Sequence, residues 1–279
     1  MDADIIHQLT KHCECSYSLV NGVCFELSFH SDDNILGGTF RHNTDKDIIL
    51  SLIGELHHLK SLNIRKCRIG RVPKWDMPFL QYLDLSCNQL PQVPDWVYDL
   101  KHLKFLNLGS NHIHNVESIP PDLETLKVHK NFISTLPPLP KSIKFLNLYL
   151  NRLRFMPVLD LPHLEFLSFG ATDVREIPLL PSSLRWLTLV ANKLVYLPDN
   201  FTQLINLEGA RLAKNQIKCL PYDIGNMSLR ELSLYSNALE SLPESFYLLK
   251  LSKLNLSKNR LNDTARVVKS FSHIEYFEC

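Results

Sequence analysis

A pattern of the form L-x-x-L-x-L-x-x-N-x-L recurs ten times along this chain, at intervals of 20 to 23 residues. Chance does not align so many positions ten times, so this recurrence constrains the fold more than any other feature. A single copy cannot bury its own apolar side, and copies of this length become stable by stacking on one another. We expect a solenoid whose coils, each named here by its first residue, begin at Leu59, Leu80, Leu103, Leu123, Ile143, Leu164, Leu184, Leu207, Leu229 and Leu251.

Each position of the pattern has a physical role. The leucines at the fourth and sixth positions point inward from a short strand, because successive strand side chains point to opposite faces. The asparagine at the ninth position follows the strand. Its amide is expected to bond backbone groups of its own turn and of the neighbouring coil, which would cost about 1–3 kcal/mol each if left unsatisfied. Cys67 and Thr172 replace this asparagine in two coils and can still donate a hydrogen bond.

These residues resemble the leucine-rich-repeat superfamily over residues 59–279. The resemblance implies an α/β horseshoe-shaped solenoid with a parallel sheet on its concave side, and about ten to eleven repeats. The central repeats, such as IPLLPSSLRWLTLVANKLVYLP, are similar to those of effectors injected by Gram-negative pathogens. Outer repeats such as LPESFYLLKLSKLNLSKNRL resemble those of intracellular Ras-binding scaffolds. The mixture is similar to secreted effectors of intracellular Gram-negative bacterial pathogens, which implies a protein translocated into the host cytoplasm.

The two ends of the chain depart from the repeat. In one branch of the effector family a ubiquitin-ligase domain with a catalytic cysteine follows the repeats, whereas only residues 262–279 follow here. Ile274, Phe277 and Cys279 match the start of an eleventh repeat, so the last repeat is incomplete. Either the protein ends on a bare edge strand or a tail is missing, and an uncovered edge favours pairing with other chains.

Residues 1–58 are expected to cap the open end of the solenoid. The segment Ser16–Phe29 has Asn21-Gly22 between two apolar runs, which predicts a hairpin with a type I′ turn. Residues 45–58 have helical periodicity, with Thr44 as the expected N-cap and one apolar face formed by Ile48, Leu52 and Leu56.

Cysteine usage and the start of the chain predict an intracellular protein. The seven cysteines are an odd number, and the first residues lack the apolar run of a signal peptide. No stretch is apolar enough to cross a membrane. Cys13, Cys15 and Cys24 are expected to be buried thiols, although the cluster also suggests part of a disulfide-bonded cap, or a zinc site with His12 and His30.

The third, fifth and seventh residues of each coil are expected to point outward on the concave side. Five of the ten third-position residues are aromatic, where a 9% aromatic content predicts about one. The rings could serve only to stabilise the sheet, at roughly 0.2–1 kcal/mol per pair. Exposed rings among polar residues are also typical of interface hot spots. We predict partner binding by Tyr82, Phe105, Phe145, Tyr149, Phe166, Trp186 and Tyr235, together with Arg65, Lys127 and Arg211.

Charge adds to this prediction. The whole chain carries a net charge of only +1. The concave side and its rim hold twelve basic side chains against three acidic ones, Asp84, Asp173 and Glu231; the basic ones are Arg65, Lys66, Arg68, Lys127, Lys130, Arg152, Lys193, Arg211, Lys214, Lys253, Lys258 and Arg260. Such a face attracts an acidic protein. We expect a partner with an apolar knob surrounded by acid, no membrane contact, and a chain that is monomeric on its own.

Other functions receive less support from the sequence. There is no Gly-rich phosphate loop or H-E-x-x-H motif, and Cys87 with His112 lacks a third orienting group, so we expect no enzyme, no cofactor and no metal. Binding of single-stranded nucleic acid is an alternative, because it also uses aromatic and basic residues. Four N-x-S/T sites leave an extracellular ligand-binding protein as another. Whether the chain recruits a protein as an adaptor or caps an enzyme as an inhibitor stays open.

Overall fold

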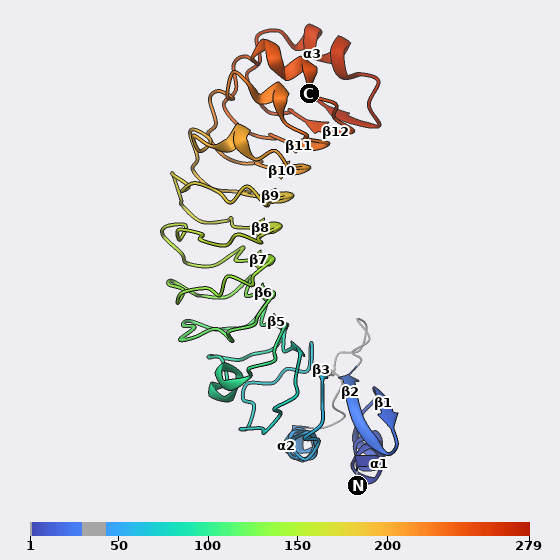
Figure 1. The fold of residues 1–279 in the computed structure, drawn as a ribbon. Coiled ribbons are helices and arrows are strands. Elements are labelled where there is room, and N and C mark those ends of the chain that lie inside the picture. The colour runs from blue at the N-terminus through green and yellow to red at the C-terminus, as the bar shows by residue number, and fades with distance from the viewer. Residues whose placement is uncertain (1, 30–42) are drawn as a thin grey trace. The chain divides into compact units, whose positions relative to one another are not determined.

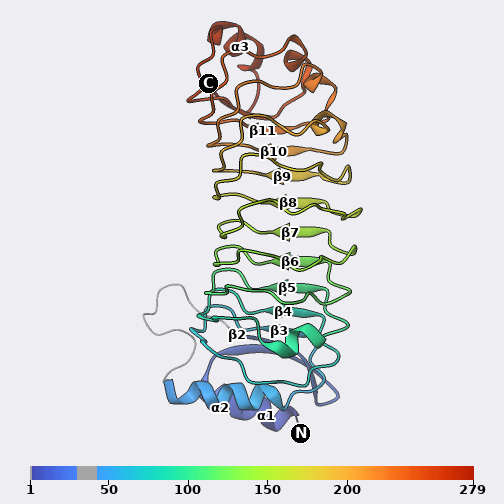
Figure 2. The same ribbon diagram turned by 90° about the vertical axis from the view of Figure 1, so that its left-hand side faces the viewer.

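The computed structural model describes residues 2–29 and 43–279 of the chain. The chain forms two compact units, Met1–Ile143 and Lys144–Cys279. Each unit is a stack of coils in which every copy of the pattern contributes one three-residue strand, and Figures 1 and 2 show these strands lying one above the next within each unit.

The first unit contains a sheet with its strands in sequence order. Strands β1 (Cys15–Val20) and β2 (Val23–Phe29) are antiparallel, and β2 to β6 are parallel. The other strands are β3 (Ser61–Asn63), β4 (Tyr82–Asp84), β5 (Phe105–Asn107) and β6 (Thr125–Lys127). The helices are α1 (Asp2–His12), α2 (Asn43–Gly54) and the 3-10 helix η1 (Asp95–Asp99).

The second unit contains an all-parallel sheet, again in sequence order. Its strands are β7 (Phe145–Asn147), β8 (Phe166–Ser168), β9 (Trp186–Thr188), β10 (Gly209–Arg211), β11 (Glu231–Ser233), β12 (Lys253–Asn255) and β13 (Tyr276–Glu278). Its helices are η2 (Phe201–Gln203), η3 (Ile224–Asn226), η4 (Glu244–Leu248) and α3 (Thr264–Phe271). In β13, Phe277 lies beside Leu254, as expected for the start of an eleventh repeat.

The ninth-position asparagines bond as the sequence predicts. The Asn88 amide donates to the carbonyls of Leu85 in its own coil (3.0 Å) and Ile64 in the preceding coil (2.7 Å). Its oxygen accepts from the backbone of Cys67 and Ile69. The substitute Thr172 donates its hydroxyl to Asn192 at 2.6 Å. Asn88 and its equivalents with the same bonds, such as Asn111 and Asn215, therefore tie two coils together and fix their register.

The residue before this position adopts a left-handed backbone in every coil, which the sequence does not predict. The φ angles lie between 54° and 59°, and none of the ten residues is glycine: Lys66, Cys87, Ser110, Lys130, Leu150, Ala171, Ala191, Lys214, Ser236 and Lys258. This conformation costs an L-residue roughly 1–2 kcal/mol. It reverses the chain after the strand, so that the asparagine side chain points into the stack, where its hydrogen bonds offset the strain.

The N-terminal residues form a hairpin that extends the first sheet. Asn21 and Gly22 have φ of 51° and 78°, as a type I′ turn requires, and β2 pairs with the first repeat strand β3. Helix α1 buries Ile5, Ile6 and Leu9 and has no counterpart in the prediction.

The prediction for the second helix needs three corrections. Helix α2 ends at Gly54 rather than at residue 58, and it begins at Asn43, so Thr44 lies inside the helix and is not its N-cap. Ile48 does not belong to the apolar face, because its side chain is 47% exposed. The buried residues of the helix are instead Ile49, Leu50, Leu52 and Ile53, at the spacing of a helix packed on a core, and Leu56 is buried just beyond its end.

The cysteine cluster consists of free thiols. Cys13 donates to the carbonyl of Leu9, Cys24 donates to that of Glu26, and burial raises the pKa of Cys24 to about 11. His30, the possible fourth zinc ligand, lies outside the described residues, and no group of metal-binding side chains occurs within residues 2–29 and 43–279. Among the same residues, no helix has the length and apolar character needed to cross a membrane.

Candidate functional site

The predicted binding residues lie on what we call the sheet face, the side of the strands that carries the third, fifth and seventh residues of each coil. Strand register aligns the third-position residues in columns: Tyr82 beside Phe105 in the first unit, and Phe145, Phe166, Trp186 and Gly209 in the second. Neighbouring strands lie about 4.8 Å apart, so aligned side chains are in contact distance.

In the first unit, two predicted rings stack and a predicted lysine adds a cation. The centroids of Tyr82 and Phe105 are 4.2 Å apart with planes 9° from parallel, and the Lys127 ammonium lies 5.0 Å from the Phe105 centroid. Burial raises the pKa of Tyr82, as does the charge of Asp84, whereas Arg65 opposes them. The four predicted residues of this unit thus form one group of rings and positive charge.

A histidine that the sequence reasoning missed lies in the same unit. The imidazole of His129 packs over Gly109, where a side chain would overlap the ring. Its Nδ1 is buried, with no hydrogen-bond partner among the described residues. Burial first, and then the charges of Lys130 and Lys127, lower the pKa of His129. Both residues occupy the seventh position of their coils, so the alignment of Gly109 with His129 was a signal available in the sequence.

In the second unit, three predicted rings cover neighbouring strands. The centroids of Phe145 and Phe166 are 4.0 Å apart with planes 1° from parallel. The Trp186 ring lies against Gly209, and a Cβ there would overlap its six-membered ring. Gly209 therefore provides the space that Trp186 needs on the sheet face.

The remaining predicted residues of the second unit are Tyr149, Arg211 and Tyr235. Lys258 holds its ammonium 5.0 Å from the Tyr235 centroid, and Arg211 is exposed. Tyr149 reaches toward the backbone of Gly170. A small pocket of about 170 Å³ lies on the next strands, lined by Ala210, Arg211, Glu231, Leu232, Ser233, Lys253, Leu254, Asn255 and Tyr276.

The three acidic residues predicted on the sheet face and its rim are engaged by neighbours. Asp84 is buried and accepts hydrogen bonds from the Ser86 backbone and from Asn107, each at 2.8 Å. Asp173 pairs with Lys193 at 2.9 Å, and Glu231 pairs with Lys253 at 2.5 Å. The basic residues therefore make the sheet face positively charged in both units.

The rings at the third position are half-buried rather than open to solvent. Stacking and burial stabilise them, as expected if the rings strengthen the sheet.

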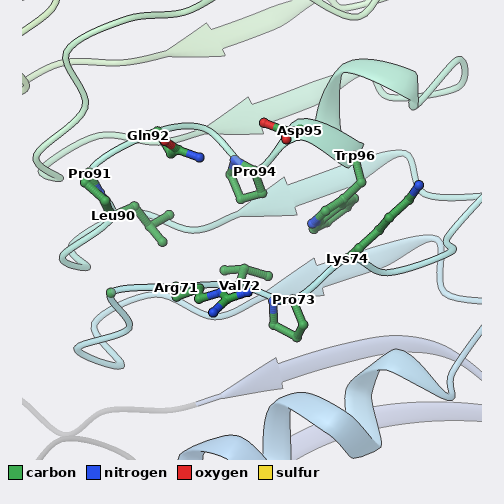
Figure 3. A pocket seen from close by; sticks show the side chains of 11 residues that line it. Arg71, Val72, Pro73, Lys74, Leu90, Pro91, Gln92, Pro94, Asp95 and Trp96 are labelled. Carbon is green, nitrogen blue, oxygen red and sulfur yellow. The ribbon is translucent and has the colours of Figure 1, made fainter.

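A larger pocket lies away from the sheet, where the coils Leu59 and Leu80 return to the next strand (Figure 3). It has a volume of about 460 Å³, with Val72, Pro73, Pro94 and Trp96 in its wall. The buried Trp96 Nε1 has no hydrogen-bond partner among the described residues, and its ring lies tilted against Trp75 at 5.4 Å. None of the predicted site residues lines this pocket.

Comparison with known proteins identifies the same leucine-rich repeats. Two family models described as leucine rich repeat match residues 57–113 and 102–126. Podocan-like protein 1 of Mus musculus is 35% identical over 203 residues, which are 65% of this chain and 35% of that protein. The chain therefore spans about a third of the length of this curated relative.

Solved structures give the same fold. A leucine-rich-repeat protein of Leptospira interrogans is 27% identical with a TM-score of 0.62, over 81% of this chain and 74% of that one. YopM of Yersinia enterocolitica is 26% identical with a TM-score of 0.58, over 74% and 52%. YopM of Yersinia pestis, a leucine-rich effector protein, is 26% identical with a TM-score of 0.60, over 72% and 61%.

The chain is thus a leucine-rich-repeat protein of the solenoid type, with a mostly parallel sheet, and it resembles bacterial leucine-rich-repeat proteins that include an effector. Its fold is that of a protein-interaction module.

Proposed function

We propose that this protein binds a partner protein through its sheet face and performs no catalysis itself. The observation that carries the proposal is the presence of stacked rings and of cations on that face in both units. Tyr82 and Phe105 are stacked beside Lys127, and Phe145 and Phe166 are stacked in the other unit, which also bears Arg211. Large rings and arginine dominate the binding energy of most protein interfaces.

The partner we propose is acidic around an apolar knob. Because Asp84, Asp173 and Glu231 are already bonded, they do not cancel exposed cations such as Arg211 and Lys214. A positive face accelerates encounter with an acidic surface and disfavours basic ones. The effect weakens as salt is added, since exposed charges are screened beyond about 8 Å at physiological ionic strength.

The setting we propose is the cytoplasm of a host cell, with the chain acting as a bacterial effector. The similarity to YopM, a leucine-rich effector protein, supports this setting. Within it the protein is either an adaptor that recruits a host protein or an inhibitor that caps a partner enzyme, including another effector. Adding the pure chain to any captured enzyme separates these roles, because only an inhibitor lowers its turnover.

The proposal is tested by capturing partners with the tagged chain and measuring their affinity. The sheet-face variant carries Phe145→Ala, Phe166→Ala and Trp186→Ala. The matched control carries Ile205→Ala, Leu248→Ala and Val268→Ala, three exposed apolar residues of the same unit that lie outside the sheet face. We expect the first variant to weaken binding at least about tenfold, and the control to retain it.

Two results contradict the proposal. One is a partner that binds the sheet-face variant normally and loses affinity for the control. The other is capture of nucleic acid of any sequence with an affinity that falls steeply with salt, which indicates single-strand binding instead.

A further inference from the structure

The second unit exposes large apolar side chains on the side opposite its strands. Phe155, Val158, Leu179, Tyr196 and Tyr222 are 83%, 84%, 66%, 63% and 84% exposed. We call this set the return ridge, because all five lie on the segments that return from one strand to the next. In Figure 1 these segments lie on one side of the coils and strands β7 to β10 on the other.

The position of the ridge follows from the repeat. Its members are the thirteenth and sixteenth residues of their coils, on either side of the proline at position fifteen. An extended segment with a proline has about three residues per turn, so these two positions share one side, while residue fourteen points inward, as the buried Met156 and Leu220 show.

Hydrogen bonds between returning segments keep successive coils aligned on this side. The Asn200 amide donates to the carbonyl of Leu180 at 2.9 Å, and the backbone of Lys218 donates to that of Val195 at 3.2 Å. Residues of equal position therefore form columns here, as they do on the sheet face.

The fold does not require apolar residues in these columns. The same two positions in the first unit are exposed and polar apart from one proline: Arg71, Lys74, Gln92, Asp95, Asn115, Ser118, Thr135 and Pro138. At 150–250 Å² per ring, the three rings of the ridge alone expose roughly 350–550 Å². Apolar area of this order on a monomer is often functional.

The charged residues around the ridge are complementary to those of the sheet face. Positions twelve to eighteen of the coils Ile143 to Leu229 carry three basic side chains, Arg154, Arg175 and Lys218, against six acidic ones, Asp160, Glu176, Asp199, Asp223, Glu240 and Glu244, of which Glu244 is paired with Arg266. The sheet face of the coils Ile143 to Leu251, rim included, carries two acidic side chains, Asp173 and Glu231, against seven basic ones, Arg152, Lys193, Arg211, Lys214, Lys253, Lys258 and Arg260. The ridge thus has the apolar, acid-bordered chemistry that the sheet face is suited to bind.

We infer that the sheet face of one copy of this chain binds the return ridge of a second copy. This inference rests on the proposed role of the sheet face, and it adds a specific occupant. The two surfaces lie on opposite sides of the same coils, so one copy can use both at once and assembly proceeds head to tail. This inference departs from the expectation, made from the sequence, that the chain is monomeric on its own.

The test uses two variants that each remove one surface. The sheet variant carries Arg211→Glu and Lys214→Glu, and the ridge variant carries Phe155→Ser and Tyr222→Ser; all four residues are exposed, so the fold is retained. Mass is measured by sedimentation over a concentration series at low salt. We expect the mass of the wild-type chain to rise beyond that of a dimer, and each variant alone to stay monomeric.

An equal mixture of the two variants gives the decisive result. Each variant keeps one intact surface, so the mixture should form one-to-one dimers and stop there. Ile205→Ser, at an exposed apolar residue outside the ridge, is the control and should assemble like the wild type. Failure of the mixture to dimerise, assembly by either variant alone, or a wild-type chain that is monomeric at every concentration overturns the inference.

Failure of the proposed function gives a different pattern. If the sheet variant loses self-association but binds a captured partner with unchanged affinity, the self-association stands and the partner uses another surface. If it loses the partner while the wild-type chain stays monomeric, the proposed function stands and the self-association is wrong.

Discussion

Within residues 144–279, rings occur on two opposite sides of the coils, in different surroundings. On the sheet face, Phe145 and Phe166 stack on each other and Trp186 covers Gly209. On the return ridge, Phe155 and Tyr222 are more than four-fifths exposed. Sheet-face rings gain stability from packing in addition to the contact surface that they offer. Ridge rings gain little from the fold, so contact with another molecule is what accounts for them.

The largest expected effect comes from replacing a buried asparagine whose hydrogen bonds hold neighbouring coils, and therefore both surfaces, in place. The Asn215 amide donates to the carbonyls of Leu189 and Leu212, and its oxygen accepts from the Leu194 backbone. Asn215→Ala leaves these buried groups unsatisfied and should lower the free energy of unfolding by about 3 kcal/mol in urea denaturation. Both surfaces should lose function together as coils lose register.

Asn206 provides the matched control for this substitution. It is exposed and makes one bond, to the carbonyl of Ser182. Asn206→Ala should change the free energy of unfolding by less than about 0.5 kcal/mol. Equal losses for the two asparagines would show that the buried ladder does not set the stability of the coils.

A medium effect distinguishes the two kinds of ring. Phe166→Ala removes a stacked, half-buried ring and should lower the free energy of unfolding by about 1–2 kcal/mol. Phe155→Ala removes an exposed ring and should change the free energy of unfolding by less than about 0.5 kcal/mol. The measurement is denaturation of both variants under one set of conditions. Equal losses of unfolding free energy would contradict the distinction between packed sheet-face rings and exposed ridge rings.

The smallest effect concerns the buried imidazole of the first unit. Because the folded state lowers the pKa of His129, folding favours the neutral ring, and the stability it contributes is complete above the unfolded value of about 6.5. That stability decreases as the pH falls from 6.5 toward the lower folded pKa. His129→Gln should reduce the pH dependence of the unfolding midpoint in this range, whereas an unchanged slope would show that His129 is not its source.

The sequence predicted those features that depend on the repeat alone. The ten strands that begin the coils, the bonding of Asn88 and its equivalents, and the pairing of Tyr82 with Phe105 all follow from a period of 20 to 23 residues. Features that depend on the path between repeats were missed. The eight-residue helix α3 is too short for its apolar spacing to be distinctive.

Two other misses have separate physical causes. The buried face of α2 was misplaced because residues at a strict four-residue spacing drift around a helix of 3.6 residues per turn. The predicted face therefore included Ile48, which is exposed. The left-handed residues had no signal, because lysine, cysteine, serine, leucine and alanine all occupy that position. The ridge could have been recognised in the sequence by comparing the thirteenth and sixteenth residues of successive coils, on either side of the proline.

Side-chain oxidation of both sets of rings in one sample tests the central claim most directly. The rings Phe145, Phe166 and Trp186 report on the sheet face, and Phe155, Tyr196 and Tyr222 on the ridge. In a dilute complex with a captured partner, the account predicts that oxidation decreases several-fold at the first set and is unchanged at the second. Protection confined to the ridge, with the sheet-face rings oxidised as in the free chain, would contradict it.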